Sequence, residues 1–359
     1  MSRKAVHLIE ISAVILASLS LCACSGFSIG DHEFFKSDTK VSKGMQALDE
    51  CDCATAHNDF RAAIADGEDM QLAYRGEGMA YLNEADYAKA IEAFDMALAS
   101  SNGMIGEAEY DISYYLAVAE YKSGDAKAAY DTYSAIIALD DEADDAYYMR
   151  GKVLLSMGNK DGAMSDYEKV LELEPKDYDH YLRIAIDLKD AGYEDDGNAI
   201  INRAMESSSR LSDYQKGVFE YYLGSYTEAR NDLEAASEKN DATELVIFLG
   251  KTYEQLGDTG YALTLYEKQT AVDPNSGNLY AQLGCAKMQE EDYEGAVQAF
   301  EAGIATGDST AMQSNMFNRI VAYEYLRDFD TAKTLMSEYL ERYPDDETAI
   351  RENKFIGTR

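Results

Sequence analysis

The chain has 359 residues, of which 46% are hydrophobic and 28% charged, and its formal net charge at pH 7 is −35. This hydrophobic content and a mean hydropathy of −0.39 are typical of a folded, soluble body. Strong acidity repels nucleic acid and anionic lipid head groups, which excludes nucleic acid as a partner and favours basic proteins, cationic peptides or divalent ions. The excess of carboxylates also serves solubility.

The first 23 residues have the pattern of a secretion signal. Arg3 and Lys4 supply the positive region, and an apolar core follows over residues 11–21. A mature membrane-spanning helix needs about 20 apolar residues, so this stretch is too short to span a bilayer. We therefore predict a signal peptide over residues 1–23.

A cysteine motif follows the apolar core directly. Residues 21–26 read Leu-Cys-Ala-Cys-Ser-Gly and resemble a bacterial lipobox. The resemblance implies that Cys24 is the lipidated residue, because cleavage before Cys22 would place the bulky Leu21 at position −1. We expect residues 24–36 to form the lipidated cysteine and a tether, and the chain to lie outside the cytoplasm, anchored by lipid to a bacterial membrane. The alternative is an ordinary signal peptide cleaved nearby.

A ladder of small residues runs through the rest of the chain at steps close to 34 residues. Its members are Ala56, Ala90, Ala129, Ala163, Gly197, Ala229, Ala262, Ala296 and Ala332. A bulky residue comes four positions after each, and a second small residue usually comes twelve positions before. Small side chains let two helices approach closely while the bulky one fills the space beside them. This period predicts a helical solenoid.

Turn residues separate the two helices of each repeat. Segments 122–125, 156–159, 222–225 and 255–258 each place Gly before Asp, Asn or Ser, which suits the end of one helix and the N-cap of the next. Pro175, Pro274 and Pro344 all fall at the same repeat position, where we expect the second helix to end. A step of 39 residues after Ala90 indicates a longer loop near residues 100–107.

These signals divide the chain into about nine helix-turn-helix units. The units begin near Ser37, Gln71, Tyr110, Asp144, Tyr178, Arg210, Thr243, Gly277 and Gln313. We predict an all-α fold, an α-solenoid superhelix over residues 37–346. Residues 347–359 are expected to form a polar capping helix and tail, which an open solenoid end requires.

The repeats resemble tetratricopeptide repeats (TPR). Residues 147–159 read Tyr-Tyr-Met-Arg-Gly-Lys-Val-Leu-Leu-Ser-Met-Gly-Asn and are followed by Ala163, Tyr167 and Pro175. Residues 248–253 read Phe-Leu-Gly-Lys-Thr-Tyr and are followed by Ala262, Tyr266 and Pro274. The resemblance implies that the opening helices line a concave groove that binds a protein or peptide.

Mapping the groove positions of such repeats onto the sequence selects a tyrosine-rich set with interspersed cations. The candidate binding residues are Arg75, Tyr114, Tyr121, Tyr148, Lys152, Lys189, Tyr214, Tyr221, Tyr222 and Lys251. Tyrosine offers amphipathic contact area at low entropic cost, which is the usual basis of binding hot spots. The alternative is that about half of these tyrosines pack against neighbouring helices.

The sequence shows no set of residues that indicates catalysis or a cofactor. No His-Glu-x-x-His, Gly-x-Ser-x-Gly or phosphate-binding glycine loop is present, so we predict neither an enzyme nor a catalytic residue. Cys51 and Cys53 lack further ligands at metal-binding spacing, and Cys285 is expected to pack. The acidic run at residues 140–145 lacks the glycine and final glutamate of a calcium loop, so we interpret it as a capped helix start and predict no metal site.

Three functions fit these expectations. The preferred hypothesis is an envelope-anchored scaffold that holds a peptide or protein in its concave groove. The second is an assembly factor for an envelope complex, such as secretion, pilus or cell-wall machinery. The third is a polysaccharide- or peptidoglycan-binding protein that uses the tyrosine face. All three follow from fold analogy and the expected anchor.

Overall fold

The computed structural model describes residues 39–359 except 51, 102, 104, 208–210 and 345, and these described residues contain α-helices and no strand. The predicted signal peptide, Cys24, the tether and Cys51 lie outside the described residues. The helices are α1 (Lys40–Asp49), α2 (Cys53–Asp66), α3 (Met70–Asn83), α4 (Tyr87–Ala99), α5 (Glu107–Lys122), α6 (Ala126–Leu139), α7 (Asp144–Ser156), α8 (Lys160–Leu173), α9 (Tyr178–Asp190), α10 (Glu194–Ser207), α11 (Asp213–Tyr222), α12 (Tyr226–Ser237), α13 (Thr243–Gln255), α14 (Thr259–Thr270), α15 (Gly277–Gln289), α16 (Tyr293–Ala305), α17 (Ser309–Tyr325), α18 (Phe329–Arg342) and α19 (Glu347–Ile356). Within this described part, no helix combines the length and apolarity that crossing a bilayer requires.

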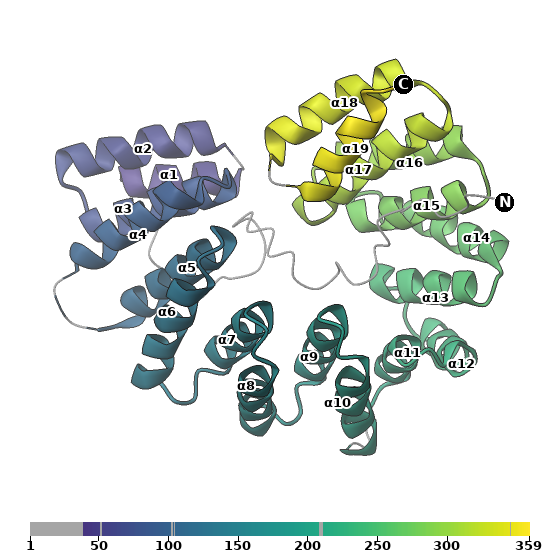
Figure 1. Cartoon of the computed structure of the whole chain (residues 1–359), viewed down its shortest axis with the longest axis horizontal. Coiled ribbons are helices and arrows are strands. Elements are labelled where there is room, and N and C mark those ends of the chain that lie inside the picture. Colours follow the sequence, from purple (N-terminus) through teal and green to yellow (C-terminus); the bar gives the residue numbers. More distant parts are fainter. Residues whose placement is uncertain (1–38, 51, 102, 104, 208–210, 345) are drawn as a thin grey trace. The chain divides into compact units, whose positions relative to one another are not determined.

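The described helices fall into two compact units, residues 39–200 and 201–359, which are treated separately below. In each unit, an odd-numbered helix packs against the even-numbered helix that follows it, as α3 does with α4 and α15 with α16 (Figure 1). Odd-numbered helices of successive pairs also meet, as α7 does with α9 and α13 with α15. The predicted all-α fold of stacked helix pairs is confirmed.

In several repeats the core contains an aromatic ring packed against a glycine. A Cβ atom on Gly151 would lie 2.5 Å from the ring of Tyr167, and one on Gly250 would lie 2.3 Å from the ring of Tyr266. Both tyrosines are fully buried. The absence of a side chain on the glycine therefore leaves room for the aromatic ring of the partner helix, which confirms the packing expected from the ladder.

Three of the four turns in which Gly precedes Asp, Asn or Ser have the predicted side-chain cap hydrogen bond. Gly158 adopts a φ of 72°, a left-handed value that favours glycine, and the Asn159 side chain accepts a hydrogen bond from the Gly162 amide. Asp125 and Asp258 cap α6 and α14 in the same way. Ser225 occupies the N-cap position of α12 as predicted, but its side chain makes no cap hydrogen bond there.

The helices end where the prolines and the longer loop predicted that they would. Pro175, Pro274 and Pro344 stand in the turns after α8, α14 and α18. The longer connection between α4 and α5 runs from residue 100 to residue 106. The final helix, α19, covers the segment expected to cap the array, and it buries Ala349 and Ile356 in the hydrophobic cluster that α18 also joins.

Candidate functional site

In the first unit, α7 and α9 bring a tyrosine, two cations and a carboxylate together. The Tyr148 hydroxyl donates a 2.7 Å hydrogen bond to Asp187 Oδ2, and Lys152 Nζ lies 3.1 Å from Asp187 Oδ1. The Arg183 guanidinium lies over the Tyr148 ring, 4.1 Å from its centroid. Burial, followed by the Asp187 charge, raises the pKa of the Tyr148 hydroxyl well above its ordinary value. Asp187 thus joins two successive repeats.

Tyr148 itself is only 1% exposed, so it cannot offer a binding surface. Arg75 is also buried, where it pairs with Asp111 and lies 5.5 Å from the centroid of the Tyr115 ring. The structure therefore assigns Tyr148 and Arg75 to packing between repeats. Repeat position alone does not reveal that a carboxylate from the next opening helix covers each residue.

The other predicted residues of the first unit differ in their surroundings. Lys189 Nζ forms a 2.6 Å ion pair with Glu194. Tyr114 is half-buried, with its ring 6.2 Å from that of Tyr133. Burial, followed by Asp145, raises the pKa of the Tyr114 hydroxyl well above its ordinary value. Tyr121 is half-buried near the end of α5. Tyr114 and Tyr121 are thus the aromatic candidates of this unit that keep some exposure.

In the second unit, three predicted tyrosines surround one phenylalanine. The Phe248 ring centroid lies 5.8 Å from that of Tyr221, 6.1 Å from that of Tyr222 and 6.3 Å from that of Tyr214. The rings meet edge to face, an arrangement that aromatic quadrupoles favour. All three tyrosines remain half-buried, whereas Phe248 is 4% exposed. We call Tyr214, Tyr221, Tyr222 and Phe248 the α11–α13 aromatic cluster.

A buried cation completes this cluster. Lys251 Nζ lies 5.2 Å from the centroid of the Tyr221 ring and 5.6 Å from that of Phe248, and the residue is 7% exposed. A cation over aromatic faces is attracted to their negative π surface. Lys251 therefore contributes charge beneath the tyrosines more than it contributes exposed contact area.

Sequence reasoning missed two residues that organise these sites. Phe248 lies three residues before the candidate Lys251, and Asp187 lies two residues before the candidate Lys189. Both side chains face the opening helix of the preceding repeat, as their contacts with Tyr221 and Tyr148 show. An aromatic or carboxylate two or three residues before a candidate lysine was the available signal.

The acidic start of α7 differs from the predicted capped start. The N-cap residue is Ala143 and no side chain caps the helix. Asp144 and Asp145 in the first turn instead lie close to His180 of α9, and one ligand atom from each residue lies within 4.8 Å of the others. The helix N-terminus still favours the two carboxylates electrostatically.

A pocket of the first unit lies away from the predicted groove. It has a volume of about 250 Å³ and is lined by residues of α4, α5 and α6, including Leu98, Tyr110 and Leu139. None of the ten predicted binding residues lines it. The pocket therefore adds no support to the predicted set.

The two described free cysteines occupy different surroundings. Cys285 packs against the hydrophobic cluster of α15–α19, and burial raises the pKa of its thiol to about 12. A thiol with so high a pKa is poorly ionised at neutral pH. Packing is the role expected for it. Cys53 is the partly exposed first residue of α2.

Four family models described as tetratricopeptide repeat match the chain, over residues 42–105, 144–177, 277–305 and 314–346. These spans include both the first and the last predicted repeats.

Curated relatives are distant. DnaJ homolog subfamily C member 3 of Mus musculus is 23% identical over 280 residues, which cover 69% of this chain and 56% of that protein. The chain thus spans about half the length of this relative. Type IV pilus assembly protein PilF of Pseudomonas aeruginosa is 25% identical over 211 residues, covering 57% of this chain and 82% of that protein.

Among solved structures, yeast Tom70 matches with a TM-score of 0.55 and 18% sequence identity, covering 92% of this chain and 69% of that chain. At this identity the likeness shows the fold alone. The four family models show that the chain contains tetratricopeptide repeats, whose family comprises protein-interaction scaffolds, and the likeness to Tom70 agrees with them in fold.

Proposed function

We propose that this chain is an envelope-anchored lipoprotein that holds a peptide or protein partner in a groove lined by its opening helices. The observation that carries the proposal is the α11–α13 aromatic cluster, where Tyr214, Tyr221 and Tyr222 stay half-buried around Phe248. Rigid tyrosines with one polar end bind partners at low entropic cost. Repeat scaffolds of this family are typically non-enzymatic.

The charge of the chain supports a basic or amphipathic partner. With a formal net charge of −35, the chain attracts cationic segments over long range and repels anionic ones. Hydrogen bonding by the tyrosine hydroxyls and contact with their rings would then fix the partner locally. Binding of this kind should weaken as salt concentration rises.

The groove is tested with Tyr221→Ala/Tyr222→Ala in the full chain. Crosslinked affinity capture from the native membrane, read by mass spectrometry, should lose its dominant partner in this variant. Tyr261→Ala is the matched control, because Tyr261 is 45% exposed on α14, a closing helix of the same unit. A partner that is captured equally by all three chains would contradict the groove proposal.

Anchoring is tested separately at the cysteine motif. Metabolic labelling with a palmitate analogue should mark the wild-type chain and Cys22→Ala, whereas Cys24→Ala should remain unlabelled and leave the membrane fraction. Equal labelling of Cys24→Ala and wild type would contradict the assignment of Cys24. The groove proposal would survive that result, because it rests on the repeats.

A second function, an assembly factor for an envelope complex, is favoured by one specific likeness. The 25% identity to a type IV pilus assembly protein extends over 82% of that relative. If this chain has such a role, it should co-migrate with a large envelope complex in native gels, and the Tyr221→Ala/Tyr222→Ala variant should still do so.

A further inference from the structure

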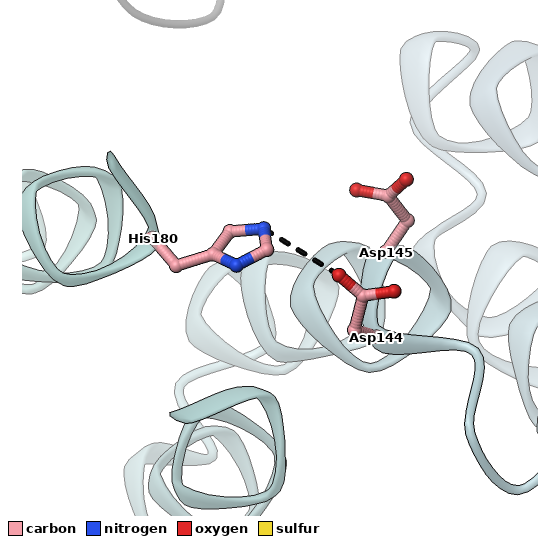
Figure 2. Close-up of side chains that lie close together, drawn as sticks. All are labelled: Asp144, Asp145 and His180. Atoms are coloured by element: carbon pink, nitrogen blue, oxygen red, sulfur yellow. Dashed lines mark ion pairs between the residues drawn. The ribbon is translucent and has the colours of Figure 1, made fainter. Parts of the chain in front are cut away.

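The imidazole of His180 in α9 lies between two carboxylates, while the backbone amide of the residue donates a 3.4 Å hydrogen bond to Asp177 Oδ1. Its side chain is 6% exposed, its Nε2 lies 3.7 Å from Asp144 Oδ2, and its Nδ1 lies 3.5 Å from Asp177 Oδ2. Nδ1 is buried without a hydrogen-bond partner. Figure 2 shows the imidazole pointing at Asp144, with the Asp145 carboxylate beside it. A buried imidazole in this state incurs an unrecovered desolvation cost.

We infer that Asp144, Asp145 and His180 bind a divalent cation of the zinc class. One ligand atom from each of these residues lies within 4.8 Å of the other two. Two ligands bonded to tetrahedral zinc at about 2.1 Å stand about 3.4 Å apart, so the 3.7 Å between His180 and Asp144 needs little adjustment. Three protein ligands leave a fourth position for water.

Asp177 supplies the outer support that such a site requires. A histidine that binds metal through Nε2 usually donates its Nδ1–H to a carboxylate, which fixes the tautomer and raises the basicity of the ligand. Here Asp177 Oδ2 stands 3.5 Å from Nδ1, on the side of the ring opposite the Asp144 contact. The two carboxylates therefore give His180 the surroundings of a metal-binding imidazole.

The charges around the site favour a divalent ion. Asp144, Asp145 and Asp177 stand around His180, and the Arg183 guanidinium interacts with the same group. Three carboxylates thus face one guanidinium, and a cation would offset the excess negative charge. The imidazole favours zinc-like ions over calcium, which prefers oxygen ligands alone.

A cation here would join two consecutive opening helices of the first unit, because Asp144 and Asp145 start α7 and His180 lies in α9. These helices already share the contact between Tyr148 and Asp187. The ion would therefore stiffen the junction between two repeats. This inference is independent of the proposed groove in the second unit.

The test is titration of the full chain with Zn²⁺, with Cys51→Ser/Cys53→Ser in every sample because thiolates also bind zinc. Calorimetry in 150 mM salt with excess Mg²⁺ should show one tight site. Asp177→Asn, which removes the outer partner, should lower the Zn²⁺ affinity by about 10–100-fold. His180→Gln, which removes a ligand, should lower it by more than that. With Co²⁺ as the probe, a visible absorption band should appear in wild type and be lost in His180→Gln.

The matched control is His57→Gln, which removes another buried histidine placed between carboxylates, Glu77 and Glu84. It should leave Zn²⁺ affinity unchanged. If His180→Gln fails to fold by circular dichroism, Asp144→Asn/Asp145→Asn decides the question. Undetectable binding by wild type at about 100 µM Zn²⁺, or equal binding by wild type and the site variant, would overturn the inference by showing only diffuse binding to acidic surface.

Discussion

Predicted groove residues have different contacts in the two units. In the first unit, Tyr148 and Lys152 both contact Asp187 of the next opening helix, and the tyrosine is buried. In the second, Tyr221 and Lys251 contact Phe248 instead, and the tyrosine stays half-buried. A tyrosine at a groove position therefore packs or remains accessible according to what the following repeat places against it.

This difference distinguishes tyrosines that stabilise the fold from tyrosines that stay accessible to a partner. A buried hydroxyl that donates a hydrogen bond to a carboxylate helps to hold neighbouring repeats together, so its removal should lower the free energy of unfolding. A half-buried ring over an aromatic platform can be removed with less damage to the fold. Four sets of variants test this contrast.

The largest effect should come from Tyr148→Ala. We expect it to lower the free energy of unfolding of the first unit by about 3–5 kcal/mol, because it leaves a cavity and an unpaired contact on Asp187. Tyr222→Ala should cost about 1 kcal/mol, since its ring is half-buried. Urea denaturation followed by circular dichroism measures both. Equal losses for the two variants would remove the distinction between the units.

Asp187→Ala should cost about 3 kcal/mol. It leaves the Lys152 ammonium, whose side chain is 17% exposed, and the Tyr148 hydroxyl without their shared acceptor. The comparison variant is Glu194→Ala, which breaks the ion pair of Lys189 with a carboxylate whose side chain is 66% exposed. That loss should stay below about 1 kcal/mol. A small effect of Asp187→Ala would show that water replaces the carboxylate.

Gly151→Ala and Gly250→Ala should be destabilising by similar amounts, about 1–2 kcal/mol each. The added methyl would meet Tyr167 in the first unit and Tyr266 in the second, and the overlap outweighs the better helix propensity of alanine. Thermal unfolding of the two variants measures this. Gly260→Ala is the control, because a methyl there meets nothing within 4 Å. Markedly unequal losses would mean that the ladder packs differently in the two units.

The smallest effect should be a pH dependence confined to the end of the second unit. Burial, followed by the adjacent Glu352, raises the pKa of Glu324 from 4.5 to about 8. A raised carboxyl pKa means that the folded state holds the proton more tightly, so this contribution to stability is present below pH 4.5 and is lost as pH rises through about 8. Glu324→Gln should therefore gain stability relative to wild type at pH 9.

Because Glu324 is partly exposed, solvent screening limits this gain to about 1 kcal/mol. Urea denaturation at pH 6 and pH 9 measures it. Glu338→Gln, an exposed change of the same charge on α18, should show no such difference between the two pH values. A pH dependence that is the same in both variants would assign it to the overall negative charge.

Much of the fold follows from signals within a few residues of one another. Ala163 and Tyr167 share one face of a helix, Gly158 and Asn159 form the turn before it, and Pro175 lies beyond its end. Such patterns predicted the helix pairs, their order and the ring-on-glycine core. They failed for individual cap hydrogen bonds, at the start of α7 and at Ser225.

An all-α repeat array can be read from the amino-acid sequence, because helix periodicity, turns and small-to-large spacing are local and recur with each repeat. The burial of Tyr148 by Asp187, the contact of Tyr221 with Phe248 and the approach of His180 to Asp144 become visible only in the folded chain. Each of these contacts joins residues about one repeat apart. Their partners depend on how successive helix pairs stack, which no short stretch of the chain specifies.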